Sequence, residues 1–408
     1  MENWKNLMHA YSNNVFVTIF LSNFASLLVN PTIADVTMEV VCLGKDECSL
    51  SIYLSGFQQA IAGLASVFMM PLIGNLSDTY DRKLLLTIPL TLAIIPFVIL
   101  GTKRTTEFFY VYYVVKTLTS TLTDGGTICL ALSYMADNVS EGKRVSAFGI
   151  FSSVVSAAMV CGTLTARILP TDRIYQVAAV VAIVAAVYMR IFLEDDRRMA
   201  HLPNDGVEQP MLKSTTEEER NESLKTTDLM KLPKDMYRLF KTSNTVSLAS
   251  FVAFFNSLAE AGIAAFLMYF LKARFHFQKD QFADIWLITY AAATFSTLTP
   301  SVGSLLQMLL DSIAWAPWVP YASAFFGIFL FLPSPSIRCI ISRKVRAHDQ
   351  SLMRNCSSGM SSLANVVSPL IFSPLSALFL SGDAPFTFPG FSILSVGLAY
   401  VRFLRFSS

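Results

Sequence analysis

Long apolar runs follow one another from about residue 14 to the C-terminus, with only short polar gaps between most of them. Most runs reach the roughly 20 residues that a helix needs to cross the hydrocarbon core of a bilayer. Hydrophobic residues make up 53% of the chain and charged residues 15%, against about 25% charged in a soluble domain. A membrane β-barrel would instead need segments of about ten residues with strict alternation, and this pattern is absent. The sequence therefore predicts an all-α polytopic membrane protein.

The apolar runs fall into two sets, separated by a long polar break that cannot bury enough apolar surface to fold alone. The first set lies near residues 14–40, 51–74, 84–102, 107–136, 145–169 and 172–193. The second set lies near residues 246–271, 282–299, 317–342, 356–381 and 386–406. We expect an N-terminal membrane half over 1–193, a cytoplasmic linker over 194–245 and a C-terminal membrane half over 246–408.

The second set contains one run fewer than the first. No Lys or Arg lies between Lys279 and Arg338, and the basic stretch that follows (343–346) needs one more crossing to reach the cytoplasm. The only candidate is Ser301–Ala316, which as a helix would measure about 24 Å at 1.5 Å per residue. Two alternatives stay open, twelve spans with one of them stunted, or eleven spans with an incomplete second half.

Basic residues indicate the orientation. Arg82 with Lys83, Lys143 with Arg144, and the Lys and Arg residues of the linker occupy alternate connections, so they belong on one side of the membrane. Loops rich in Lys and Arg stay in the cytoplasm. We expect both termini to be cytoplasmic, while the choice between plasma membrane and endomembrane stays open.

Cysteine and histidine usage argues against a metal centre. Cys42 and Cys48 share the first short loop and can form a disulfide if that loop faces an oxidising lumen. The histidines are dispersed, and we find no nucleophile elbow, zinc-protease motif or phosphate-binding glycine loop. We therefore expect no enzyme activity, no cofactor, no bound metal and no nucleic-acid partner.

A charged turn separates the second and third apolar runs. It reads Gly-X-Leu-X-Asp-X-X-Asp-Arg-Lys, with its defining residues at Gly74, Asp78, Asp81, Arg82 and Lys83. This pattern resembles the signature between helices two and three of the major facilitator superfamily, Gly-X-Leu-X-Asp-X-X-Gly-Arg-Lys/Arg. Glycine at such a turn permits close helix approach, and the acid can pair across the interface with a cation or a helix end.

Two further segments narrow the resemblance. Tyr134–Asp137 followed by Glu141–Arg144 is similar to the helix four to five connection of the tetracycline-resistance-like branch. Gln281–Asp284 and Ser373–Leu380 are similar to plant and animal hippocampus-abundant-transcript-like members of that branch. The resemblance implies two six-helix halves and a secondary transporter.

The resemblance also implies a gate. In such families the acid and the arginine of the signature are thought to lock the two halves through a charge network, which here would link Asp78 and Arg82 with Asp137 and Arg144. The alternative is that Arg82, Lys83 and Arg144 only orient the helices, as positive loops do in any membrane protein.

Three departures from the family pattern matter. Asp81 replaces the signature glycine, although Asp tolerates left-handed backbone geometry. The antiporter-type Gly-Pro pair on helix five appears as Gly162-Thr163, which leaves efflux by exchange unsupported. The second-half copy of the charged turn is missing from the cation-free stretch.

Ionisable residues inside spans mark transport pathways by default. Lys116 and Ser120 lie one turn apart on the fourth run. Asp124 lies eight residues beyond Lys116, about 12 Å along the helix axis and about 80° round it. On the seventh run, Asn256 and Glu260 share one face. We expect these five residues to form a substrate or proton pathway. Structural pairing inside the bundle is the alternative.

The leading hypothesis is a secondary active transporter that moves an unidentified small solute by alternating access, within membrane lipid and without needing an oligomer. Proton coupling would use Glu260, because a carboxyl in low-dielectric surroundings favours its protonated form. The alternative is a non-transporting truncated isoform or membrane scaffold that binds a full-length relative. Its motivation is the compressed stretch near residues 300–316.

Overall fold

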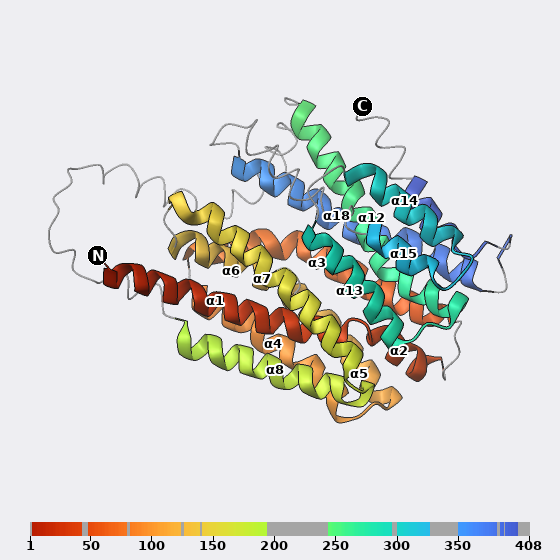
Figure 1. Cartoon of the computed structure of the whole chain (residues 1–408), viewed down its shortest axis with the longest axis horizontal. Helices are drawn as coiled ribbons and strands as arrows, with labels where there is room; N and C mark the ends of the chain where they lie inside the picture. Colours follow the sequence, from red (N-terminus) through yellow and green to blue (C-terminus); the bar gives the residue numbers. More distant parts are fainter. Residues whose placement is uncertain are drawn as a thin grey trace.

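A computed structural model describes residues 2–42, 48–79, 82–123, 126–138, 141–193, 244–295, 300–326, 350–381, 384–386 and 388–398. The described part is a bundle of helices that contains no strand (Figure 1). The predicted linker lies outside the described residues except for the start of the helix that follows it.

The first half matches the predicted runs closely. Its helices are α1 (Glu2–Val29), α2 (Ile33–Val41), α3 (Ser49–Thr79), α4 (Arg82–Thr102), α5 (Thr106–Thr123), α6 (Gly126–Asn138), α7 (Glu141–Ile168) and α8 (Thr171–Phe192). The first predicted run is two helices, because Pro31 in the break lacks an N–H and clashes with the preceding turn. Residues 124–125, between α5 and α6, lie outside the described ranges.

In the second half, the candidate for an extra crossing is a short helix. The helices described there are α12 (Asn244–Phe275), α13 (Lys279–Phe295), α14 (Pro300–Ile313), α15 (Val319–Phe326) and α18 (Gln350–Leu380), with further helical residues at 391–398. The candidate segment Ser301–Ala316 corresponds to α14, which is only 14 residues long. A helix of that length measures about 21 Å, shorter than the hydrocarbon core of a bilayer.

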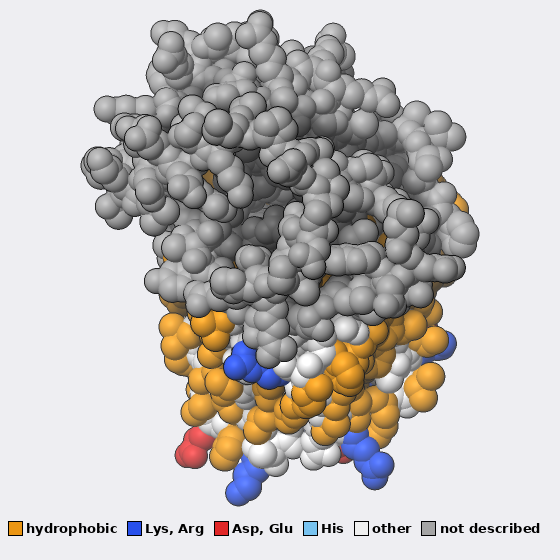
Figure 2. All heavy atoms as spheres, turned by 90° about the vertical axis from the view of Figure 1, so that its left-hand side faces the viewer, with side chains coloured by type: hydrophobic (Ala, Val, Ile, Leu, Met, Phe, Trp, Pro, Cys, Tyr) orange, Lys and Arg blue, Asp and Glu red, His pale blue; other side chains and the backbone are white. Residues whose placement is uncertain are grey.

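Six described helical segments are long and apolar enough to cross a membrane. They are Asn14–Val41, Lys83–Thr102, Ile150–Ile168, Thr171–Phe192, Ser250–Phe275 and Met360–Leu380. Large apolar side chains on their outer surfaces are exposed, as Val180, Val184 and Ile191 of α8 are. Where side chains are described in Figure 2, most of those visible are hydrophobic and only a few are charged. The protein is therefore an integral multi-pass membrane protein.

Among the described residues, the buried side chains form three clusters that follow the two halves. Two clusters contain only residues of α1–α8 and the positions next to these helices. The third is built from residues of α12 to 391–398, together with Ala34, Met38 and Ile52 from α2 and α3. Each half therefore has its own core, and α2 and α3 are the places where the first half packs into the core of the second.

One end of the bundle is defined by a disulfide between Cys42 and Cys48, which joins the end of α2 to the start of α3. We call it the disulfide end. The connections α4–α5, α7–α8 and α12–α13 lie at this same end, on the right of Figure 1 and opposite the N-terminus. The start of α4 and the junction of α6 and α7 lie at the other end.

Gly390 is expected to be essential for the stability of the second half. A Cβ at this position would lie 1.9 Å from the Ser312 carbonyl oxygen, a backbone atom that cannot rotate away. Replacing Gly390 with alanine should destabilise the protein by about 1–3 kcal/mol through overpacking, measured as a lower thermal unfolding midpoint in detergent. The matched control is Gly101→Ala, whose Cβ would lie 3.4 Å from its nearest neighbour, the Gln176 backbone nitrogen, which is an ordinary contact distance. Equal midpoints for the two variants would contradict this prediction.

Candidate functional site

A polar pair lies at the middle of α12. The side-chain amide of Asn256 donates a hydrogen bond to Glu260 Oε1 at 3.0 Å, one turn away on the same face. Asn256 is only 2% exposed, and its Oδ1 has no hydrogen-bond partner among the described residues. A polar pair in a membrane helix with unmet hydrogen-bonding capacity is suited to bind a polar ligand or a proton.

The face of α12 that carries Glu260 points away from its tightest neighbour. A Cβ on Gly262 would lie 3.3 Å from Ser368 Oγ of α18, and Ser368 Oγ donates to the Leu258 carbonyl oxygen at 2.9 Å. Gly262 therefore marks the face of α12 that packs on α18. Two residues correspond to about 200° of helix rotation. Glu260 thus projects to the opposite side, and its side chain is only partly buried.

The first-half members of the predicted pathway lie on α5. Lys116 is partly buried there, and Ser120 is buried with its hydroxyl donating to the Thr117 carbonyl oxygen at 2.9 Å. The Ser120 hydroxyl therefore donates its hydrogen bond within its own helix, as serine commonly does in membrane helices. Asp124 lies outside the described residues. The structure brings Asn256 and Glu260 into contact and keeps Lys116 and Ser120 one turn apart on a helix of the other half.

The residues of the predicted gate lie at helix ends remote from the disulfide end. Gly74 and Asp78 lie in the last turns of α3, and Asp137 lies in the last turn of α6. The first turns of α4 and α7 contain Arg82, Lys83 and Arg144. Lys83 is the only one of these whose side chain is described, and Asp81 lies outside the described residues. Because α6 packs against α3, α4 and α7, the helices that carry the predicted charge network are neighbours.

At the disulfide end, α12 is tied to α2 and α3 of the first half. Lys272 forms an ion pair with Asp35 of α2, and both side chains are largely buried, with 13% and 17% exposure. The hydroxyl groups of Tyr269 and Ser55 of α3 share a hydrogen bond. Tyr269 and Lys272 are three residues apart, so they lie on the same face of α12.

A second pair of contacts joins α7 and α13. Arg167 Nε lies 2.9 Å from Asp284 Oδ1. Lys279 Nζ donates to the carbonyl oxygen of Leu169, just beyond the end of α7, at 2.5 Å. These contacts also connect the two halves at the disulfide end.

The helices α3 and α18 make the closest packing between the halves. A Cβ on Gly63 would lie 2.9 Å from the Asn365 carbonyl carbon, and one on Gly56 would lie 2.4 Å from Ser373 Oγ. The Ser373 hydroxyl also donates to the Ile52 carbonyl oxygen at 2.9 Å. Small residues let two membrane helices approach each other in this way.

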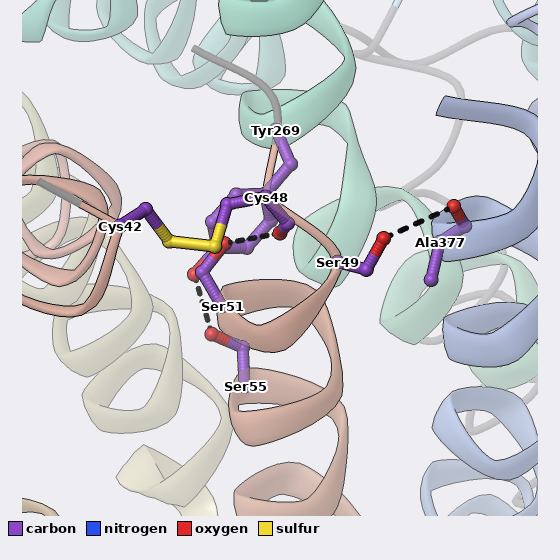
Figure 3. Close-up of a disulfide and its surroundings, with 7 residues drawn as sticks. All are labelled: Cys42, Cys48, Ser49, Ser51, Ser55, Tyr269 and Ala377. Carbon is purple, nitrogen blue, oxygen red and sulfur yellow. Dashed lines mark hydrogen bonds between the residues drawn. A yellow bond between two sulfur atoms is a disulfide. The ribbon is translucent and has the colours of Figure 1, made fainter. Parts of the chain in front are cut away.

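The disulfide lies beside these contacts (Figure 3). Cys48 precedes Ser49, whose hydroxyl donates to the Ala377 carbonyl oxygen of α18 at 3.5 Å. Ser51 Oγ donates to the carbonyl oxygen of Cys48 at 2.8 Å. The start of α3 is thus bonded both to α2, through the disulfide, and to the second half.

A charged hollow of about 550 Å³ opens at the disulfide end. Its lining comes from both halves and includes Asp35, Met38, Glu39, Arg104, Thr171, Asp172, Lys272, His276 and Gln278. The ion pair between Asp35 and Lys272 forms part of its wall. A second ion pair, Arg104 with Asp172 at 3.1 Å, joins two parts of the first half only.

Sequence reasoning missed several of these residues. Lys272 and Arg167 lie near the ends of predicted spans, where single charges ordinarily mark the membrane surface. Only the fold reveals that each of them pairs with an acid of the other half. Asp311 of α14 was also missed. It is 1% exposed and accepts a hydrogen bond from Ser323 of α15. An acid inside an apolar run was the signal that could have found it.

No grouping of three or more His, Cys, Asp or Glu side chains suited to a metal occurs within the described ranges. A family model described as Major Facilitator Superfamily matches residues 15–341 of the chain. The chain belongs to the Major Facilitator Superfamily. The resemblance read from the charged turn is confirmed, and with it the expectation of a membrane transporter rather than an enzyme.

Curated relatives of this superfamily member support the same branch. The hippocampus abundant transcript 1 protein of Mus musculus is 24% identical over 387 residues, covering 89% of this chain and 72% of that protein. The hippocampus abundant transcript-like protein 1 of Homo sapiens is 23% identical over 387 residues, covering 89% and 70%. The class G tetracycline resistance protein of Vibrio anguillarum is 29% identical over 103 residues, or 25% of each chain.

Solved structures share the fold of this superfamily member. The nucleoside transporter NupG matches with a TM-score of 0.67 at 13% identity, covering 97% of this chain and 98% of its own. A D-xylose-proton symporter matches with a TM-score of 0.69 at 13% identity, covering 98% and 97%. Coverage of nearly the whole chain confirms the predicted fold class, in spite of the short α14.

Proposed function

We propose that this superfamily member is a secondary active transporter that moves a small solute by alternating access. Its halves, 1–193 and 246–408, would rock about a midplane site while the linker 194–245 joins them in the cytoplasm. The observation that carries the proposal is the Asn256–Glu260 pair at the middle of α12, on the face turned away from α18. Transporters built from two such halves bind their substrate near the bilayer midplane, and a polar group with an unused hydrogen-bond acceptor at this depth is suited to that role.

The contacts at the disulfide end support the proposal of two alternating states. Ion pairs and hydrogen bonds there join the halves, so the described conformation corresponds to a state closed at this end. Alternating access then requires these contacts to break and the opposite end to close. The predicted charge network of Asp78, Arg82, Asp137 and Arg144 is our proposal for what holds that opposite end closed.

Each pathway residue has a proposed role. Glu260 takes up and releases a proton, and Asn256 orients its carboxyl group through the 3.0 Å hydrogen bond. Lys116, Ser120 and Asp124 supply polar groups from the first half. A site formed by both halves couples cargo binding to their relative motion, because the cargo then contacts different groups in each state.

We infer that the disulfide end faces the non-cytoplasmic side and that both termini are cytoplasmic. Two observations support this orientation. Disulfides persist in oxidising compartments, which lie outside the cytoplasm. The opposite end contains the first turn of α4, which begins with Arg82, and the first turn of α7, which contains Lys143 and Arg144. The positive-inside rule places these basic residues in the cytoplasm.

The experiment that tests the proposal is uptake into proteoliposomes. Purified protein would be reconstituted and given a panel of labelled solutes with and without an imposed pH gradient. Nucleosides, D-xylose and organic anions are the first classes to test, because they appear in the names of structurally similar transporters. Uptake of at least one class above that of empty vesicles would support transport. Absence of flux with a broad panel would contradict it.

Replacing Lys116 with alanine is expected to reduce uptake by about tenfold or more, because pathway charges make direct contacts with cargo or with protons. Thermal stability and the amount of protein in the vesicle membrane should stay at the parental level. The matched control is Lys103→Ala, an exposed lysine in the α4–α5 connection. Unchanged kinetics in Lys116→Ala would remove this residue from the pathway.

The second candidate function is a non-transporting partner of a full-length relative, and the short α14 favours it. Its outcome in the same experiment differs. The reconstituted protein would move no solute, yet it would co-purify from cells with a twelve-span relative of the superfamily.

A further inference from the structure

We propose that the Cys42–Cys48 disulfide is a redox-controlled latch that stabilises the state closed at the disulfide end, by holding Asp35 against Lys272. The inference rests on the alternating access proposed above. A disulfide within one short loop would thereby affect whether the two halves stay joined at this end. Three features of the structure support it.

The first feature is the shortness of α2. This helix has only nine residues and is separated from α1 by the break at Pro31. At its start it is held by backbone hydrogen bonds, such as the one that Val36 N–H donates to the Thr32 carbonyl oxygen at 3.0 Å. At its end, the disulfide of Cys42 ties it to Cys48. The position of Asp35 on this helix therefore depends on both attachments, together with the packing of buried residues such as Ala34 and Met38.

The second feature is the firm attachment of α3 to the second half. Its first turns bond to α18 through Ser49 and through the Ile52 carbonyl oxygen, and to α12 through Ser55. The disulfide therefore links α2 to the part of the first half that is itself bonded to the second half. Cutting it would leave α2, which carries Asp35, joined to α3 only through the peptide chain of residues 43–47.

The third feature is the common target of α2 and α3. The hydroxyl of Ser55 contacts Tyr269, and Asp35 contacts Lys272, one turn further along α12. Both contacts lie on one face of α12. The disulfide joins the two segments that hold this face, so it preorganises the ion pair and reduces the entropy lost on forming it.

The chemistry of the switch is thiol–disulfide exchange with a low-molecular-weight thiol. One thiolate attacks a sulfur of the pair and forms a mixed disulfide, releasing the other cysteine as a thiolate that takes up a proton. A second thiolate attacks the mixed disulfide and releases the second cysteine. The S–S bond is reduced by two electrons, and two molecules of thiol become one external disulfide. Cys48 is the more accessible partner, being partly exposed while Cys42 is 8% exposed.

The test measures a distance between the halves at the disulfide end. Thioether-linked spin labels would be placed at Lys103→Cys and Gln278→Cys, both exposed and on opposite halves. The chain has six cysteines, and the four outside the disulfide would be replaced by serine. Distance distributions would be compared for the intact disulfide, for the same sample treated with a dithiol, and for Cys42→Ser/Cys48→Ser.

We expect reduction and the double serine variant each to increase the long-distance population at least twofold. Asp35→Asn should increase it as well, because it removes one charge of the ion pair. Combining Asp35→Asn with the serine variant should add little beyond Asp35→Asn alone, since groups that act through one another are non-additive. The matched control is Asp172→Asn, which breaks an ion pair in the same hollow but within the first half, and should leave the distances unchanged.

The outcomes separate this inference from the proposed function. If Asp35→Asn opens the disulfide end but reduction and the serine variant do not, the latch role of the disulfide is wrong and alternating access stands. If the serine variant adds its full effect to that of Asp35→Asn, the disulfide does not act through Asp35. If no variant or condition, including added cargo, yields a second distance, alternating access itself is contradicted. Dithiol treatment of the folded protein keeps the test valid if the serine variant fails to fold.

Discussion

Glu260→Gln is expected to abolish the part of solute uptake that depends on a pH gradient, a loss of about tenfold or more in gradient-driven flux. Glutamine keeps the size of the side chain and can still accept the hydrogen bond from Asn256. It cannot take up and release a proton. Uptake by counterflow, which needs only the exchange of cargo across the membrane, should continue in this variant.

The measurement compares the two modes of flux in the same proteoliposomes, with an imposed pH gradient and with preloaded cargo. The control is Glu107→Gln, an exposed acid in the first turn of α5, which should leave both modes intact. Gradient-driven uptake that survives in Glu260→Gln would remove the proton role of Glu260. Loss of counterflow as well would instead indicate that Glu260 binds cargo.

Gly63→Leu is expected to prevent closure of the disulfide end and so to stop transport. Even a Cβ at this position would lie 2.9 Å from the Asn365 carbonyl carbon and 3.0 Å from the Val366 nitrogen. These are backbone atoms of α18, so relief requires α3 and α18 to move apart. Overpacking costs about 1–3 kcal/mol, which corresponds to a shift of about 5-fold to 150-fold away from the closed state.

The label pair at residues 103 and 278 reports this shift directly, and uptake should fall in parallel. The control is Gly126→Ala in the first half, where the nearest atom is the end of the flexible Ile73 side chain at 3.3 Å. It should leave the distances and the uptake close to those of the parent. A closed-state distance that persists in Gly63→Leu, with normal uptake, would mean that the halves do not separate along α3 and α18.

The positions of the helices were largely predictable from the sequence, because lipid allows few solutions for a backbone that must satisfy its own hydrogen bonds. The run predicted at 172–193 is α8, Thr171–Phe192, and the run at 84–102 is α4, Arg82–Thr102. Where the sequence predicted one continuous run over 14–40, a proline divides it into α1 and α2. The candidate for an extra crossing was inferred from charge alone, since a basic stretch had to reach the same side as the others, and α14 covers that segment with 14 residues.

The candidate site was predictable only in part. Asn256 and Glu260 share a face by their spacing, and the structure adds the hydrogen bond between them. That this face points away from α18 follows only from the packing of Gly262. The gate residues stay a prediction, because Asp81 and most of the side chains concerned lie outside the described residues.

The sequence by itself determined a polytopic helical membrane protein, its superfamily and the helices that carry its polar residues. These properties follow from local features, namely hydrophobic run length, loop charge and one short signature. Only the tertiary structure decided which residues join the two halves. Asp35 and Lys272 are separated by 237 positions, and no local pattern links residues so far apart. Their pairing depends on how α2, α3 and α12 pack together at the disulfide end.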